Sequence, residues 1–268
     1  MDSTGDGHSE QWLASFERAL SCAWQMSSPL MTESEGRSCF ADFHSDQRAG
    51  FNLDLSITID QGLQKTDFTV QDLKQLSQHW DHAVLNEVFV NQLSSPSQSL
   101  SAEKVSLLIY QELAGKLSQR EISLESFTLG VTRDFKVQIE KSSASLPCVL
   151  WRLPFQSALD FSIMESAQST LEPFSGYLWL GFQGEILAPH GTIVPYDDIR
   201  ILSQTWLDEV RGRPVNKILE ARTEGEIYAN LLSWFQTRSP ALSSIEFVNL
   251  ANGRSSKCVA PSIEIGRA

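Results

Sequence analysis

The histidines of this sequence are the residues that could bind a metal ion, but their spacing does not gather them. His79 and His82 lie three positions apart on a predicted helix, with no third ligand evident beside them. His44 and His190 fall in predicted loops, and a solvated turn accounts for His190. Zinc sites in proteins use at least three side-chain ligands, so we expect no metal and no other cofactor.

The cysteines do not form a reactive pair. Cys22, Cys39, Cys148 and Cys258 are widely separated, without a Cys-x-x-Cys motif. The first ten residues have neither the basic start nor the apolar stretch of a secretory leader, so we expect a cytoplasmic protein with four free thiols. Each thiol is expected to act as a small buried hydrophobic residue.

Composition limits the classes of function. The apolar content of 41% is sufficient for a globular core, and the net charge of −12 disfavours binding to nucleic acid. No apolar run approaches the roughly 18 residues that a membrane span requires. We therefore expect neither a nucleic-acid partner nor membrane insertion.

The sequence contains an internal repeat. Residues 72–80 match residues 198–206, with Asp, Leu, Ser, Gln and Trp retained. At the same separation, residues 49–51 (Ala-Gly-Phe) fall on residues 175–177 (Ser-Gly-Tyr). The polar stretch 141–147, which ends in proline, is typical of a connector. We infer two tandem modules, residues 1–141 and 147–268.

Hydrophobic periodicity predicts the same order of elements in each module: strand, strand, helix, helix, strand, strand. This order predicts an α+β fold in which antiparallel sheets carry their helices on one face and leave strand edges unpaired, so we expect oligomers that close into a barrel. The predicted strands are 12–26, 51–59, 126–140 with an interruption near 133–134, 149–163, 177–186, 244–249 and 257–263. For 12–26 a short helix is the alternative, and the analogy with 149–163 favours a strand. The predicted helices are 69–80, the segment after Ser101, 195–210 and 224–235.

Residues 80–86 read Trp-Asp-His-Ala-Val-Leu-Asn, which resembles the Leu-Asp-His-x-x-Leu-Asn motif of the 6-pyruvoyl- and 6-carboxy-tetrahydropterin synthase family. A helix start at residues 70–74 and a helix cap at residues 100–104 resemble two further family motifs, in the same order. The resemblance covers about residues 10–140 and extends to about 150–260 through the repeat. It implies the tunnelling fold, ββααββ, with pterin- or purine-like ligands held between subunits.

The zinc site that the resemblance implies is absent from this sequence. Family members hold zinc with three histidines, two of them in a His-Gly-His triplet. Here the triplet is Ala49, Gly50 and Phe51, and the remaining ligand position falls near Trp24. The second module has Ser175, Gly176 and Tyr177 instead. Neither module can build the family's metal site.

The resemblance also implies a proton relay of a Cys, an Asp and a His. Asp81 and His82 match the motif, whereas Cys39 lies farther from the triplet than the family's cysteine does. The alternative is that Asp81 caps a turn and His82 packs between helix and sheet. These three residues would be catalytic only if the protein is an enzyme.

The ligand-binding positions implied by the resemblance are also altered. The pterin-binding Glu of the family's third strand falls near Thr132 in the first module and Asn249 in the second, so neither module retains its carboxylate. Glu103 matches the Glu of the second-helix motif, where the second module has Gly225. The second module also has Arg211 and Gly212 in place of Asp-His, so the first module is the better preserved.

Three hypotheses follow. The first is a repurposed or non-catalytic protein, acting as a scaffold or as a binder of a pterin- or purine-like ring. The second is a zinc-independent, pterin-related lyase or synthase that uses Asp81 and His82. The third is an unrelated α+β interaction protein. If single-module relatives form hexamers, fused pairs should reach six modules with three chains, so we expect a homotrimer.

Overall fold

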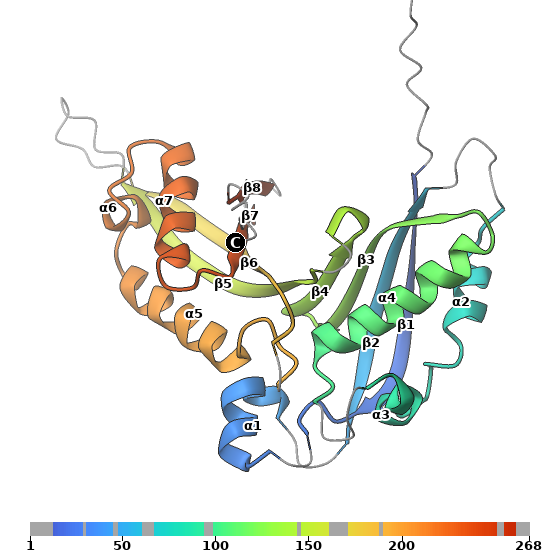
Figure 1. Ribbon diagram of the computed structural model, residues 1–268. Helices are drawn as coiled ribbons and strands as arrows, with labels where there is room; N and C mark the ends of the chain where they lie inside the picture. The colour runs from blue at the N-terminus through green and yellow to red at the C-terminus, as the bar shows by residue number, and fades with distance from the viewer. Residues whose placement is uncertain are drawn as a thin grey trace, which may run out of the picture.

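One continuous antiparallel sheet runs through the whole molecule (Figure 1). The computed structural model describes residues 13–28, 31–44, 48–60, 67–93, 99–143, 146–160, 171–187, 190–250 and 255–260. The sheet has eight strands in the order β1 to β8, so each strand pairs with its neighbour along the chain. We call residues 13–143 the first half and residues 146–260 the second half.

The first half contains four strands of the sheet and the helices between them. Its strands are β1 (Leu13–Trp24), β2 (Ala49–Asp60), β3 (Ser123–Thr132) and β4 (Phe135–Glu140), its helices are α1 (Glu33–Phe40), α2 (Val70–Ser77), α3 (Leu85–Val88) and α4 (Ala102–Ser118), and short 3-10 turns cover Ala41–Phe43, Val90–Gln92 and Lys141–Ser143.

The second half follows the same plan. Its strands are β5 (Cys148–Asp160), β6 (Leu171–Gln183), β7 (Leu242–Asn249) and β8 (Ser255–Val259), and its helices are α5 (Tyr196–Val210), α6 (Val215–Ile218) and α7 (Glu224–Gln236). The order β1-β2-α2-α3-α4-β3-β4 thus recurs as β5-β6-α5-α6-α7-β7-β8. Helix α1, between β1 and β2, has no counterpart among the described residues of the second half.

The two halves join through β4 and β5. Residues 135–138 of β4 pair with residues 148–151 of β5, and the Arg152 amide extends the ladder by donating to the Asp134 carbonyl at 2.8 Å. The inner strand edges of the two halves, which the sequence left unpaired, thus pair with each other.

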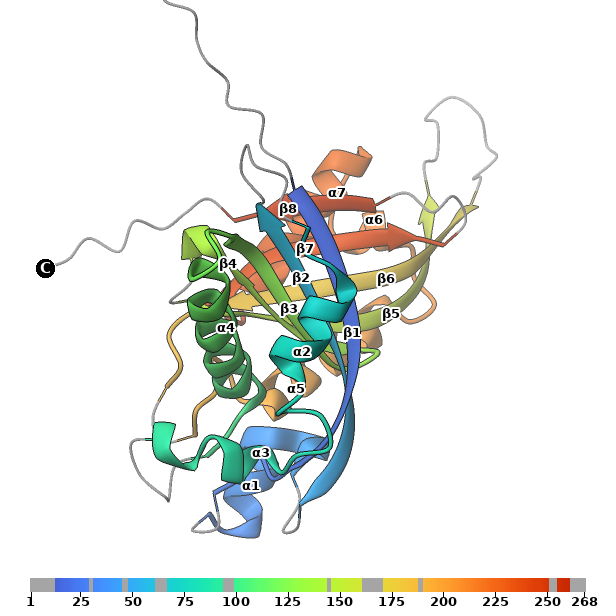
Figure 2. The same ribbon diagram turned by 90° about the vertical axis from the view of Figure 1, so that its right-hand side faces the viewer.

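The helices pack against one face of the sheet, and alternate strand residues point into that interface (Figures 1 and 2). In β2, Leu53, Leu55, Ile57 and Ile59 are buried while Asp54 is exposed. Buried residues of both halves form one hydrophobic cluster. None of the helices in the described part of the chain is long and apolar enough to cross a membrane.

Most predicted elements are confirmed, with shifts of a few residues at their ends. Helix α1 was missed, although the capping box between Thr32 and Glu35 that begins it could have been read from the sequence. The predicted strand segment 126–140 forms β3 and β4, and its predicted interruption near 133–134 is the β3–β4 turn. The ends of the predicted strands 149–163 and 257–263 lie outside the described residues.

Strand register corrects one part of the internal repeat. Each half has a β-bulge: β3 skips Glu125 between the partners of Ile59 and Thr58, and β7 skips Ser243 between the partners of Phe182 and Gly181. Matching the bulges makes Ile59 equivalent to Phe182. In this register Gly50 corresponds to Pro173, so its sequence match with Gly176 is wrong.

The helices of the predicted repeat have the same burial pattern at matched positions. Trp80 and Trp206 are both fully buried, and Leu73 and Ile199 occupy equivalent buried positions on α2 and α5. The segment between strand and helix is three residues longer in the second half, since 206 − 80 is 126 and 182 − 59 is 123. A sequence match without gaps cannot account for this difference.

An asparagine holds the end of a strand in the same way in each half. The Asn86 side chain accepts from the Gln25 amide at 2.8 Å and donates to the Gln25 carbonyl at 2.9 Å. The Asn216 side chain accepts from the Asp160 amide at 2.9 Å and donates to the Asp160 carbonyl at 2.8 Å. Each asparagine therefore satisfies both backbone polar groups of one residue at an edge that no strand of the described chain covers.

Replacing either asparagine should destabilise the protein, because Asn86→Ala or Asn216→Ala leaves a partly buried amide and carbonyl without their partner. We expect each variant to lower the free energy of unfolding by about 1–3 kcal/mol, measured by urea denaturation. The control is Asn52→Ala, whose exposed side chain accepts from the Ser21 hydroxyl and should change stability by less than about 0.5 kcal/mol. Equal effects for all three variants would contradict a specific role for the Asn86 and Asn216 hydrogen bonds.

Candidate functional site

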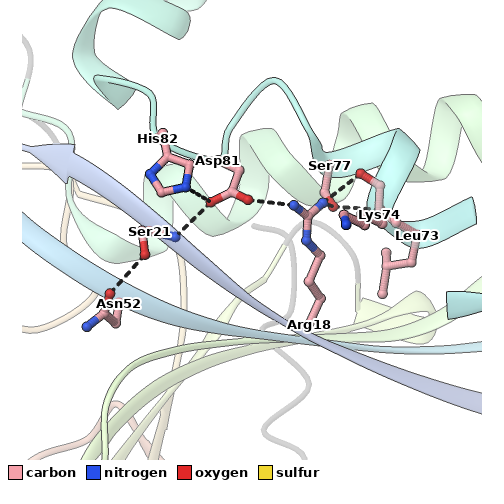
Figure 3. Close-up of polar contacts among 8 residues, drawn as sticks. All are labelled: Arg18, Ser21, Asn52, Leu73, Lys74, Ser77, Asp81 and His82. Carbon is pink, nitrogen blue, oxygen red and sulfur yellow. Dashed lines mark hydrogen bonds and ion pairs between the residues drawn. The ribbon is translucent and has the colours of Figure 1, made fainter. Parts of the chain in front are cut away.

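Asp81 is a structural cap on the free edge of β1 (Figure 3). Its Oδ1 accepts from the Ser21 amide at 3.0 Å, and its Oδ2 accepts from Arg18 Nη2 at 2.6 Å. The Ser21 hydrogen bond, followed by the Arg18 charge, lowers the pKa of the Asp81 carboxyl. Arg18 is itself fixed by the Lys74 carbonyl and the Ser77 hydroxyl. Asp81 is thus an ionised group whose two oxygens are engaged, which makes it a poor general base.

His82 projects into solvent from a strained backbone position. Its side chain is 83% exposed, and its Nε2 lies 3.8 Å from Asp81 Oδ1. Its φ of +57° is in the left-handed region, and the equivalent residue of the second half is Gly212 with φ +68°. The backbone conformation directs the His82 amide onto the Ser21 carbonyl. His82 does not pack between helix and sheet, as one reading of the sequence expected.

Cys39 lies elsewhere in the molecule. It is buried on α1, which packs against α5 of the second half. Burial raises the pKa of its thiol, and the nearby Asp198 and Glu35 charges raise it further. The structure therefore does not bring Cys39 together with Asp81 and His82 within one chain, and its environment opposes formation of a thiolate.

The thiol beside Asp81 is Cys22, which sequence reasoning did not select. Burial and the Asp81 charge raise its pKa to about 12. A thiol with this pKa is neutral near pH 7 and cannot act as a thiolate base. Cys22 follows Ser21 in β1, where alternate residues are buried, and its side chain is on the buried face. This alternation is the sequence signal that could have identified Cys22 as the thiol near Asp81.

Glu103 joins the two halves. It is fully buried at the start of α4, where Oε1 accepts from the Ile193 amide at 3.1 Å and Oε2 is hydrogen-bonded to the Tyr196 hydroxyl. Burial raises the pKa of Glu103 to about 7. Both oxygens of the predicted ligand-binding carboxylate are therefore occupied by residues of the same chain.

The other two predicted ligand-binding residues lie apart from Glu103. Thr132 ends β3, where its exposed side chain accepts from the Asp134 amide at 3.2 Å in the β3–β4 turn. Asn249 ends β7 and pairs with Gly176 in the second half. In the register set by the matched bulges, Thr132 corresponds to Leu250 and Asn249 to Val131, so the two residues are not equivalent. Neither is among the hydrogen-bond partners described for Glu103.

Aromatic rings occupy the positions where the resemblance implies zinc ligands. The rings of Trp24 and Phe51 contact each other, with centroids 4.8 Å apart, and Trp24 Nε1 donates to the Leu100 carbonyl at 2.9 Å. These side chains fill the space and offer no metal ligand, so the residues present do not fit zinc.

The remaining histidines do not make a metal centre. His79 forms an ion pair with Glu112 at 2.8 Å, and burial lowers its pKa. Across the described ranges, no group of three or more His, Cys, Asp or Glu side chains is arranged to hold a metal ion.

The chain is similar to solved structures over about half of its length. The structure of 6-pyruvoyl tetrahydropterin synthase from Caenorhabditis elegans aligns with 49% of this chain and 96% of its own, at 18% identity and a TM-score of 0.38. An uncharacterised protein from Wolinella succinogenes aligns with 50% of this chain and 99% of its own, at 10% identity and a TM-score of 0.35. No family model and no curated protein matches the chain.

The buried Glu103 predicts a specific pH dependence of stability. Its folded pKa of about 7 lies above the ordinary glutamate value of 4.5, so its stabilising contribution is complete below pH ~4.5 and is lost as pH rises through ~7. Glu103→Gln removes this ionisation. We expect its stability relative to the wild type to increase between pH 5 and 8, by up to about 3 kcal/mol, in urea denaturation. Glu87→Gln, at an exposed carboxylate, is the control, and parallel pH curves for wild type and Glu103→Gln would contradict the assignment.

The backbone at His82 predicts a gain of stability from glycine. His82→Gly relieves the left-handed strain while removing a side chain that is mostly exposed. We expect the free energy of unfolding to rise by about 0.5–1 kcal/mol. Ala83→Gly, at a neighbour without a positive φ, should lower it. Loss of stability in both variants would show that the His82 side chain contributes more than its contacts indicate.

Proposed function

We propose that the protein is a non-catalytic scaffold built from two tunnelling-fold modules in tandem. The observation that carries the proposal is that its motif carboxylates are used internally. Asp81 holds the β1 edge, and Glu103 holds the second half through Ile193 and Tyr196. Residues that could serve a ligand or a proton transfer therefore serve the fold.

Three independent features support the tandem interpretation. The order of elements recurs, the β-bulges fall at matching places, and Asn86 and Asn216 clamp matching strand ends. The left-handed pair His82 and Gly212 adds a fourth correspondence. Such local details do not follow from an α+β architecture alone.

The alternative function, a zinc-independent lyase or synthase, has weaker support. It would depend on Asp81, whose pKa is lowered and whose oxygens are bound, and on His82, which is exposed at the sheet edge. Cys39 is not beside them. A pterin- or purine-like ligand at Glu103 would have to displace Tyr196 from a fully buried contact.

The contact between the halves also suggests how copies assemble. Strand β4 pairs with the first residues of β5. At the other end of β5, Asn216 binds the backbone of Asp160 on the same edge of the strand. The equivalent first residues of β1 have no partner strand in the described chain, while its later residues are covered by residues 81–86. We infer that β8 of one copy pairs with β1 of another.

The internal junction specifies the register. The matched bulges make Val137 equivalent to Ser256, and Val149 equivalent to Ala14. Because Val137 pairs with Val149, Ser256 should lie opposite Ala14 of the next copy. Val70 supports this arrangement, since it is 57% exposed at the position equivalent to Tyr196, which is buried against the other half.

The number of copies follows from the shared sheet. Chains that contribute modules in edge-joined pairs do not divide evenly into rings of three modules, which argues against six modules in two such rings. Pairing of β8 with β1 between copies closes its smallest ring with two copies. We therefore propose a dimer in place of the trimer expected from the sequence.

A cross-linking experiment tests the register. The double variant Ala14→Cys with Ser256→Cys should form a covalent oligomer on mild oxidation, because Cα atoms of opposed strand residues are about 4.5–5.5 Å apart, within disulfide range. Ala14→Cys with Ser255→Cys is the matched control, since its two side chains point to opposite faces. Light scattering of the wild type should give twice the 29.9 kDa of one chain.

Several outcomes would overturn the proposal. A stable monomer at micromolar concentration, or equal cross-linking in both double variants, would contradict the assembly. A co-purified pterin that is lost in Glu103→Gln would contradict a purely structural role for Glu103.

A further inference from the structure

The second half contains a pocket beside α5 and α7. At the equivalent position of the first half, an ion pair joins α2 to the end of α4. In the first half, Arg120 Nη1 donates to Asp72 Oδ1 at 3.0 Å. The equivalent residues are Arg238, which like Arg120 directly follows the C-cap of its helix, and Asp198, which like Asp72 lies three residues after the N-cap. No ion pair joins Asp198 and Arg238 in the described structure, and both line a cavity of about 320 Å³.

The charged groups are held apart by their local contacts. In the first half, the Thr69 N-cap and Asp72 form a capping box. Pro195 occupies the N-cap position of α5 and has no side-chain hydroxyl for Asp198. Arg238 instead lies over the Trp234 ring at 3.8 Å and 3.6 Å from Glu209. The carboxylate and the guanidinium therefore both remain on the pocket wall.

Smaller side chains leave the space between them. Phe68 is buried in the first half and packs against Phe16, whereas the equivalent residue of the second half is the half-buried Val194. Pro240 likewise replaces the buried Ile122. The other walls are mostly apolar and include Phe182, Ile193, Ile199 and Leu202.

We propose that this pocket binds a free α-amino acid with an apolar side chain. The ammonium group would pair with Asp198, the carboxylate would pair with Arg238, and the side chain would occupy the apolar walls. A cavity of this size suits a small ligand, and a few charged groups on an apolar wall fix a ligand's orientation. Burial and Asp197 raise the pKa of Asp198, and a bound ammonium group would favour its ionised form.

This inference is independent of the proposed scaffold role. All residues that line the cavity belong to the second half, and the site requires neither Glu103 nor the contact between copies. Loss of assembly in the cross-linking experiment would therefore leave the pocket proposal untouched, and the reverse is also true.

Calorimetric titration of the full chain tests the proposal with L-leucine and L-phenylalanine as probes. We expect saturable binding of at least one of them, with a dissociation constant below about 10 mM. Asp198→Asn and Arg238→Gln should each weaken binding about tenfold or more, because each removes a charge-assisted hydrogen bond. Val194→Phe, which copies the first half's Phe68, should abolish binding.

Capped probes and matched variants separate this site from weak general binding. N-acetyl-L-leucine lacks the ammonium group and L-leucinamide lacks the carboxylate, so both should bind about tenfold more weakly than L-leucine. Asp72→Asn and Arg120→Gln, the equivalent changes in the first half, should leave binding unchanged. Failure of both amino acids to bind, equal binding of the capped probes, or unchanged binding in Asp198→Asn and Arg238→Gln would overturn the proposal.

Discussion

The pairing of β4 with β5 is the contact on which the rest of the molecule depends. A strand edge exposes backbone donors and acceptors that must be paired or hydrated. Joining the two inner edges satisfies these groups and makes one sheet from two sets of four strands. The same contact brings α1 against α5 and places Glu103 beside Tyr196.

The polar residues around this sheet illustrate how a motif can persist in structure without its chemistry. A buried or partly buried carboxylate is costly unless hydrogen bonds satisfy it. Asp81 obtains them from Ser21 and Arg18, and Glu103 obtains them from Ile193 and Tyr196. Each carboxylate is therefore required by its neighbours, whether or not a ligand ever approaches it.

The sequence predicted features that depend on local periodicity and missed those that depend on distant contacts. Alternation along β2 and helical spacing in α2 are properties of short segments, and both elements were identified. The partner of Glu103 lies 93 residues away, so no local pattern could indicate it. The strand match between Gly50 and Gly176 failed because the longer connection in the second half shifts the register.

Helix α1 was missed for a different reason. Its residues are mostly polar, and its buried positions are Gly36, Cys39 and Phe40. It is stabilised by packing on α5 of the other half and by its capping box, so its apolar face is too short for periodicity to detect. Helix α1 places Cys39 close to Asp198 of α5. Cys39, which the sequence assigned to a proton relay, is therefore a packing residue in the structure.

The order of the strands has a consequence for synthesis on the ribosome. Because each strand pairs with its predecessor, the sheet can grow in the direction in which the chain emerges. Glu103 is made before Tyr196, and at about 5–20 residues per second the 93 residues between them take several seconds to appear. During that interval the β4 edge lacks β5, and the Glu103 carboxyl lacks Ile193 and Tyr196. A nascent chain paused there exposes an open strand edge, the state in which this protein would be most prone to aggregation.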